Sequence, residues 1–139
     1  MYSLIYVSSS VNHFSTSDLF DLLEKSKMNN MAKDITGILL YKDGNFLQVL
    51  EGPKQAVLST FTTIEKDVRH RGSIVIIEAE IQEREFSGWS MAFRNLNLNE
   101  SEYPEGYNKF LNVSFTDNEF RNNSSLAHEL INLFNVSIR

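Results

Sequence analysis

The residue type that stands out in this chain is a glutamine inside an apolar strand. Residues 35–52 hold two apolar runs on either side of Lys-Asp-Gly-Asn, and an Asp-Gly pair in that setting is typical of a tight hairpin turn. Gln48 lies in the second run, with Phe46 and Leu50 as its neighbours on the same face. Because both faces of this strand are apolar, we expect the amide to be buried. A buried amide without hydrogen bonds costs about 1–3 kcal/mol, so the sequence predicts a partner for Gln48.

Further hydrogen-bonding or aromatic side chains fall inside elements that read as core. They are Tyr6 in the first strand, Asn29 and Asn30 at the end of the first helix, and Trp89 and Met91 on one face of the last strand. Each has an ordinary structural explanation alone, such as an asparagine that caps a helix. Together with Gln48 they are expected to form a polar-edged pocket in an apolar core, which suits a flat heteroaromatic ligand.

The sequence lacks the residue patterns that nucleophilic catalysis, metal binding and phosphate binding need. The chain has no cysteine, which excludes disulfides, thiolate metal sites and a cysteine nucleophile. His13, His70 and His128 fall in a loop, a helix end and the tail, without an evident serine partner, and the dispersed glycines form no phosphate loop. Glu78 and Glu80 share one face of a strand, where like charges are usually solvated. We therefore expect neither a catalytic residue set nor a metal site.

Composition and charge limit the partners. With 139 residues, 42 % of them apolar, the chain is long enough for one domain with a core. Its net charge of −5 argues against a nucleic-acid partner, which needs clustered positive charge. No apolar run approaches the length of a membrane span, and the first residues lack a signal-peptide pattern, so we expect no membrane partner and a cytoplasmic location.

The pattern of elements predicts an α+β fold. We expect strands over residues 2–8, 35–42, 45–51, 73–83 and 87–94. A first helix is expected from Ser15-Thr16-Ser17-Asp18 to about Met28. A second helix is expected from Pro53 to Arg71-Gly72, with an apolar stripe that reaches Val68. The order β-α-β-β-α-β with an additional fifth strand is the ferredoxin-like arrangement, with two helices on one sheet face. Leu126, Leu130, Leu133 and Phe134 at helical spacing predict a C-terminal helical extension.

Several segments of the chain resemble the BLUF domain, a family of blue-light sensors that use flavin adenine dinucleotide (FAD). The most specific is the block Phe-Leu-Gln-Val-Leu-Glu-Gly-Pro over residues 46–53, preceded by Tyr6 at a separation of 42 residues. Supporting segments are Ile5–Ser8, Asn29-Asn30, Ile35–Tyr41, Asp67–His70 and Trp89–Met91. The resemblance implies a flavin-binding domain over residues 1–94 and a helical extension over 95–139 that packs on the sheet within the same compact unit.

The resemblance also implies a photochemical pair. Tyr6 would give an electron and then a proton to the excited flavin, and Gln48 would lie between Tyr6 and the ring. Rearrangement of the Gln48 amide, by rotation or by tautomerisation, would leave a red-shifted signalling state. Trp89 and Met91 compete for the position beside Gln48 and would carry the signal onward.

Further residues are implied to bind the cofactor. Asn30 would hold the polar edge of the ring with Asn29 at its border, Ile35 and Ile38 would form ring walls, and Asp67, Arg69 and His70 would surround the far edge of the ring and the ribityl and phosphate tail. Many family members carry a basic residue after the first strand, where this chain has Ser8-Ser9-Ser10, and Lys27 is the expected substitute.

The signal is expected to leave through protein–protein contact with an unidentified downstream partner, because no catalytic domain follows, and self-association into a dimer or larger ring is expected. Two alternatives remain. A ferredoxin-like ligand-binding or structural module would need no photochemistry. A small hydrolase resembling acylphosphatases would need an arginine after the first strand, and the segment Ser8–Asn12 has none.

Overall fold

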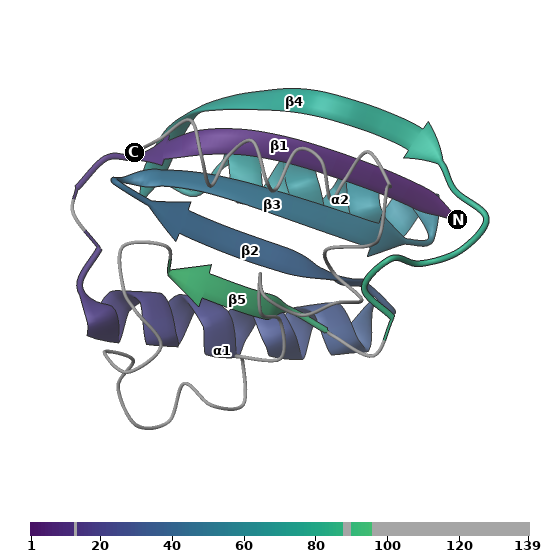
Figure 1. Cartoon of the computed structure of the whole chain (residues 1–139), viewed down its shortest axis with the longest axis horizontal. Coiled ribbons are helices and arrows are strands. Elements are labelled where there is room, and N and C mark those ends of the chain that lie inside the picture. Colours follow the sequence, from purple (N-terminus) through teal and green to yellow (C-terminus); the bar gives the residue numbers. More distant parts are fainter. Residues whose placement is uncertain (13, 88–89, 96–139) are drawn as a thin grey trace, which may run out of the picture.

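The computed structural model describes residues 1–12, 14–87 and 90–95 (Figure 1). The elements follow in the order β1 (Tyr2–Ser10), α1 (Thr16–Ala32), β2 (Thr36–Lys42), β3 (Asn45–Gly52), α2 (Lys54–Glu65), β4 (His70–Glu80) and β5 (Ala92–Asn95). The predicted ferredoxin-like α+β order with a fifth strand is therefore confirmed. The expected C-terminal helical extension lies outside the described residues. No helix in the described part of the chain is long and apolar enough to span a membrane.

The five strands form one sheet in the order β4-β1-β3-β2-β5. All neighbours are antiparallel except β2 and β5, which run parallel. The hairpin between β2 and β3 turns at Asp43 and Gly44, whose φ angles of 50° and 79° are those of the tight turns that match strand twist. The central position of β3 places Gln48 between β1 and β2.

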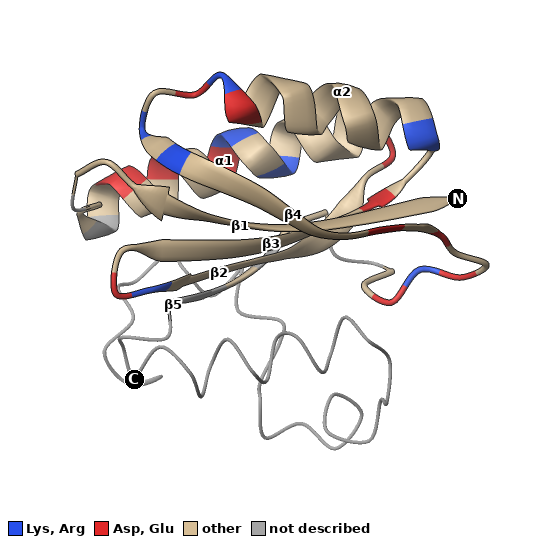
Figure 2. Cartoon of the chain, turned by 90° about the horizontal axis from the view of Figure 1, so that it is seen from above, with Lys and Arg blue, Asp and Glu red and all other residues tan. Residues whose placement is uncertain are grey.

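Both helices cover the same face of the sheet, as Figure 2 shows. Strand alternation directs Leu4, Tyr6 and Leu50 toward the helices, where they join one buried cluster with Leu23 of α1 and Val57 of α2. Each such aliphatic side chain contributes about 1.5–3 kcal/mol when removed from water. This cluster is the core that fixes the helices over the sheet.

Helix α1 begins where the sequence predicts and ends later. Ser15 is the N-cap and forms a capping box with Asp18, since each side chain bonds the backbone N–H of the other residue. The helix runs to Ala32 rather than to about Met28. Asn30 therefore lies in the last helical turn, only 2 % exposed, instead of serving as an end cap.

Helix α2 ends earlier than predicted. It stops at Glu65 instead of Arg71-Gly72, and Val68 is 84 % exposed instead of continuing the apolar stripe. The amides of Lys66 and Asp67 close a tighter turn onto the carbonyls of Thr63 and Ile64. The Asp67 carboxylate then accepts the Arg69 N–H, which offers the backbone an alternative to the helix. Strand β4 consequently starts at His70 rather than at residue 73.

Strand β5 is shorter than predicted and covers only Ala92–Asn95 instead of residues 87–94. Residues 81–87, which follow β4, form an irregular link. Arg84 of this link bonds the backbone carbonyls of Glu51 and Asp34, which ties the link to the ends of β2 and β3. Alternating polarity predicted a longer strand, but in the described residues the pairing with β2 begins at Ala92.

Candidate functional site

A cavity of about 60 Å³ lies between the helices and the helix-covered face of the sheet. Its walls come from β1, β2, β3, both helices and the turn after α2, and include Tyr6, Leu22, Ser26, Gln48, Asp67 and Arg69. The predicted meeting of Tyr6 with Gln48 is thus present at a cavity wall. The site stands on three central strands, so its floor is rigid.

Tyr6 and Gln48 are direct cross-strand partners. Both side chains are 4 % exposed, and the Tyr6 hydroxyl donates to Gln48 Oε1 at 2.5 Å. Burial raises the pKa of the Tyr6 phenol well above its ordinary value, and the negative charge of Asp67 adds to that rise. The phenol is therefore a neutral donor at ordinary pH, and the amide oxygen is its acceptor.

The other end of the Gln48 amide faces a weak partner. Its Nε2 donates to the sulfur of Met91 at 3.6 Å, and Met91 is 3 % exposed. A thioether is a poor acceptor, and the amide nitrogen has two hydrogens, so Gln48 retains donor capacity. Met91 occupies the position next to Gln48, whereas Trp89 lies outside the described residues.

Asn30 connects α1 with the approach to β5. Its Nδ2 donates to the carbonyl oxygen of Ser90 at 2.9 Å. Ser90 precedes Met91, so this bond helps to fix the residue that contacts Gln48. Asn29 is exposed, and neither Asn29 nor Asn30 is among the residues that line the cavity.

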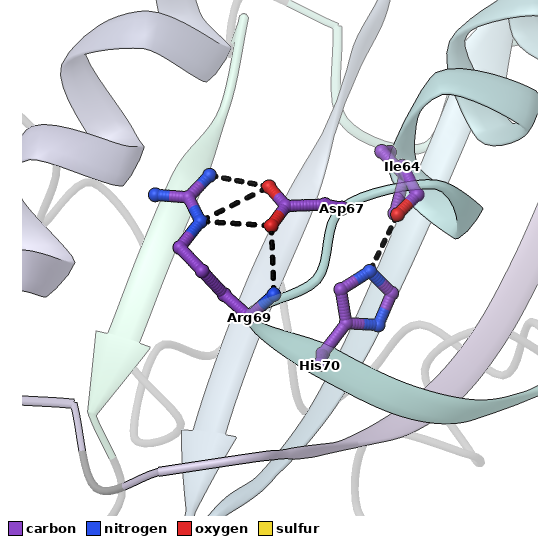
Figure 3. Close-up of polar contacts among 4 residues, drawn as sticks. All are labelled: Ile64, Asp67, Arg69 and His70. Carbon is purple, nitrogen blue, oxygen red and sulfur yellow. Dashed lines mark hydrogen bonds and ion pairs between the residues drawn. The ribbon is translucent and has the colours of Figure 1, made fainter.

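The rim of the cavity carries charge. Asp67 and Arg69 form an ion pair, with the guanidinium Nε at 2.9 Å and 3.0 Å from the two carboxylate oxygens (Figure 3). The hydrogen bond from Arg69 lowers the pKa of Asp67 to about 2. His70 Nε2 donates to the Ile64 carbonyl at 2.5 Å, which ties the start of β4 to the end of α2. The structure thus brings all three predicted rim residues together.

A second cavity of about 310 Å³ adjoins the first and shares Phe14 and Arg69 with it. Asn12, Asp18, Asp21 and Lys25 complete its lining. The basic side chain that α1 contributes to this cavity is Lys25, whereas Lys27, suggested from the sequence as a basic neighbour at the end of the helix, does not line it.

The two isoleucines predicted as ring walls, Ile35 and Ile38, do not line this cavity. Ile38 pairs with Val49, one residue away from Gln48 on β3, so strand alternation directs Ile38 to the opposite sheet face. Ile35 is 1 % exposed in the core cluster and does not line the cavity. The cavity wall from β2 is Leu39, which pairs directly with Gln48.

Sequence reasoning also missed several wall residues, namely Ser8, Leu22, Ser26, Leu39 and Ile64. A signal existed for two of them, because Leu22 and Ser26 are spaced i, i+4 on the buried side of α1. Ser8 is two residues after Tyr6 on the same strand face. Its Oγ is buried without a hydrogen-bond partner among the described residues.

The types of side chain that line the two cavities suit a flavin. Apolar walls suit the faces of a flat ring, and the amide of Gln48 and the free hydroxyl of Ser8 offer polar groups inside the cavity. The charged rim and the adjoining cavity suit a polar tail. An α+β domain with this pocket is a small-molecule-binding domain for a heteroaromatic ligand.

Comparison with known proteins identifies the family. The model of the BLUF family, described as sensors of blue light using FAD, matches residues 1–92. The chain belongs to the BLUF family. It is therefore a domain for blue-light sensing with a bound flavin, as the resemblance in the sequence predicted.

Individual relatives agree with this assignment. Photoactivated adenylate cyclase subunit beta from Euglena longa is 36 % identical over 90 residues, which cover 64 % of this chain and 10 % of the relative. The dark-state structure of BlrB, a BLUF protein, superposes with a TM-score of 0.66 at 32 % identity, covering 69 % of this chain and 73 % of BlrB. BlrP1 of Klebsiella pneumoniae, in complex with FMN and cyclic diGMP, gives a TM-score of 0.75 at 30 % identity, covering 96 % of this chain and 34 % of BlrP1. The chain spans about a tenth of the length of the first of these relatives.

Proposed function

We propose that this chain binds FAD in the cavity beside Gln48 and converts blue light into a changed hydrogen-bond arrangement of that side chain. The observation that carries the proposal is the buried 2.5 Å bond from the Tyr6 hydroxyl to Gln48 Oε1. It joins a residue that can lose an electron and a proton to a residue that can accept the proton and then change orientation.

A bound flavin supplies absorption of blue light and, when excited, an acceptor for an electron. Tyr6 would give the electron and then the proton to the excited flavin, with Gln48, which accepts the hydrogen bond of the phenol, on the path between them. The amide then exchanges its donor and acceptor ends, either by rotation or by tautomerisation. Return of the electron and the proton to Tyr6 leaves the changed amide as the signal.

Two arrangements of Gln48 are possible because Tyr6 is a donor and an acceptor. In the arrangement seen, Oε1 accepts from the phenol and Nε2 faces the Met91 sulfur. After an end-for-end exchange, Nε2 would donate to the phenol oxygen and Oε1 would face the sulfur. Tyr6 keeps one hydrogen bond in both arrangements, so they differ mainly in what Gln48 presents to the ligand. This small difference favours a two-state switch.

The cofactor of this proposal is FAD rather than FMN. The support is the adjoining cavity, where Lys25 and Arg69 provide cations for phosphate groups and Asn12, Asp18 and Asp21 provide partners for hydroxyl and amino groups. Cofactor released by heat from purified protein and separated by chromatography is expected to be FAD. Recovery of FMN alone from protein expressed with both nucleotides available would contradict this part of the proposal.

The same proposal covers the remaining roles of the chain. Residues 1–94 form the flavin domain and 95–139 the helical extension, and Asn30 with the rim residues Asp67, Arg69 and His70 holds the cofactor. The proposal keeps Asn29 at the border of the cofactor only because it is next to Asn30 in the sequence. Output passes through Met91 and Trp89 to a cytoplasmic protein partner or a second copy of the chain, without a reaction catalysed by this chain.

Absorption spectroscopy tests the function directly. Purified protein is expected to be yellow and to show a reversible red shift of its flavin bands under blue light. A colourless preparation that takes up no added FAD, or flavin bands that light does not move, would favour a ferredoxin-like module without photochemistry. Scattering mass in the dark and in the light would show whether the output includes self-association.

A further inference from the structure

Glu51 is a buried carboxylate outside the flavin cavity. It lies three positions after Gln48 on β3, and hence on the other face of the sheet, and is only 1 % exposed. An ionised group is expensive to bury unless its oxygens receive hydrogen bonds, so its partners identify what it holds in place.

The partners of Glu51 include the backbone of the link between β4 and β5. Oε2 accepts from the Glu85 N–H at 3.0 Å, and Oε1 accepts from the Phe86 N–H at 2.6 Å. The Thr36 hydroxyl donates to Oε1 at 3.0 Å. Phe86 itself is fully buried. The carboxylate therefore fixes the middle of an otherwise irregular segment.

Arg84 completes the attachment. Its Nη1 donates to the Thr36 hydroxyl at 3.0 Å and to the Glu51 carbonyl at 3.2 Å, and its Nη2 pairs with an Asp34 carboxylate oxygen at 3.1 Å. Acidic and basic residues lie next to each other along this link in Figure 2. Residues 84–86 are thus bound to the ends of β2 and β3 through several hydrogen bonds.

The fixed segment leads directly to the switch. Phe86 is five residues before Met91, whose sulfur faces Gln48 Nε2, and Ser90 between them accepts from Asn30. The entry to β5 therefore has two attachments, one at Glu51 on the far side of the sheet and one at Gln48 and Asn30 inside the site. Displacement of Met91 by a rearranged Gln48 must act against the attachment at Glu51.

We propose that Glu51 is a positioning residue for the photochemical switch: by holding the Glu85 and Phe86 amides it keeps Met91 in its dark position and so sets the rate of dark recovery. This inference rests on the proposed function. We take the attachment at Glu51 to be re-formed before Met91 regains its dark position. A looser attachment then raises the energy both of the dark arrangement of β5 and of the transition state that leads back to it, so the lit state persists longer.

The charge of Glu51 makes the attachment sensitive to pH. Burial raises the pKa of its carboxyl, opposed by the hydrogen bonds that it accepts. The charged groups of the link that face Glu51 are Arg84 and Glu85, and Asp34 lies beyond Arg84. The cross-strand neighbours of Glu51, Ser3 and Thr36, are uncharged. Because the pKa is raised, Glu51 takes up a proton at higher pH than an ordinary glutamate and then loses acceptor capacity for the link.

The test compares Glu51→Gln with Glu83→Gln, which removes an equal charge from an exposed position of the same link. A glutamine has one acceptor oxygen, so the Glu85 or the Phe86 amide loses its partner. In the dark, hydrogen exchange of that amide is expected to be roughly tenfold faster in Glu51→Gln and unchanged in Glu83→Gln. Dark recovery is expected to be at least about threefold slower in Glu51→Gln, with the size of the light shift retained.

The pH profile separates positioning from general stability. Wild-type recovery is expected to slow as pH falls and to approach the rate of Glu51→Gln, whose own rate stays flat. If Glu51→Gln does not fold, Thr36→Val should slow recovery, and Thr36→Ser, which keeps the hydroxyl, should restore it. The inference would be overturned if the wild type shows the light shift but recovers at the same rate, and with the same pH profile, as Glu51→Gln. No light shift in the wild type would instead overturn the proposed function, while the exchange measurement would still report on the attachment.

Discussion

Two tyrosines lie buried on the helix-covered face of the sheet, and they differ in what meets the hydroxyl. Tyr6 on β1 is 4 % exposed and donates to Gln48. Tyr41 on β2 is 3 % exposed, and its hydroxyl has no partner among the described residues. Its ring packs against Phe46 with centroids 4.9 Å apart and against Phe14 at 6.2 Å.

The difference shows that the amide, rather than the phenol, selects the site of the proposed chemistry. Both rings are near the cavity, since Phe14 and Phe46 line it. A tyrosine that loses an electron must also release its proton, and this needs an acceptor in place. Tyr6 has one within 2.5 Å, whereas Tyr41 is surrounded by aromatic rings. Two equally buried phenols therefore have different functions.

The largest effect is expected from Tyr6→Phe, with Tyr41→Phe as its matched control. Each change removes one buried hydroxyl from the same sheet face. We expect Tyr6→Phe to bind flavin and to lose the light-induced red shift completely, while Tyr41→Phe keeps the full shift. Difference spectra under blue light check both. A red shift that persists in Tyr6→Phe, or disappears in Tyr41→Phe, would contradict the assignment of the photochemistry to Tyr6 rather than Tyr41.

Gln48→Leu removes the acceptor of the Tyr6 hydroxyl, so that Tyr6, like Tyr41, has a buried hydroxyl without a hydrogen-bond partner in the described part of the chain. The variant leaves the Tyr6 hydroxyl buried without its acceptor, so we expect flavin binding without a red shift. An orphaned buried hydroxyl costs about 1–3 kcal/mol, and the added apolar side chain offsets part of it, so the free energy of unfolding should fall by no more than about 2 kcal/mol. Urea denaturation of the flavin-free protein measures this. A retained shift would show that Gln48 is not the moving part.

Tyr41→Phe also has a stability prediction of its own. Removing a hydroxyl that has no partner removes its desolvation penalty, so the free energy of unfolding should rise by about 1 kcal/mol or stay unchanged. The denaturation midpoint of the flavin-free variant provides the measurement. A decrease of more than about 1 kcal/mol would reveal a bonding partner for Tyr41 and would weaken the contrast with Tyr6.

The smallest effect is expected from Asp67→Asn, which tests the electrostatic part of the Tyr6 environment. Burial is the main cause of the raised pKa of Tyr6 and Asp67 the lesser one, so the light shift should remain. The pKa of Asp67 is lowered from 3.8 to about 2, so its contribution to stability is present above about pH 4 and is lost as pH falls toward 2. Denaturation midpoints measured between pH 5 and 2 should show this acid-induced loss of stability in the wild type and not in Asp67→Asn. Identical acid profiles would contradict the pairing with Arg69.

Much of the fold and the centre of the site could be predicted because local patterns determine them. The Asp-Gly turn sets the register of β2 and β3, and the family block places Gln48 opposite Tyr6. The sheet face of Ile38 could not be predicted, because an apolar strand buried on both faces gives no alternation from which to assign its sides. Its correct side follows only from the register with Val49.

Predictions also failed where tertiary hydrogen bonds decide the backbone. After α2 the Asp67 carboxylate accepts the Arg69 amide, and after β4 residues 84–86 are held by hydrogen bonds to Glu51 of β3. Neither produces a periodic signal. Glu51 reads as one more residue of the family block, and its role as an acceptor for a distant link becomes visible only in three dimensions.

The pairing of Tyr6 with Gln48 has a consequence for folding. The hairpin of β2 and β3 closes through a short turn, whereas β1 reaches β3 only by closing a loop of 42 residues that includes α1. Such a closure costs more chain entropy than a turn, so we expect the β1–β3 ladder to form after the hairpin. During synthesis Tyr6 emerges long before its partner, and partly folded chains hold Gln48 without a phenol. The proposed photochemical pair is therefore absent from a chain that has formed only the hairpin, and it requires the long-range pairing of β1 with β3.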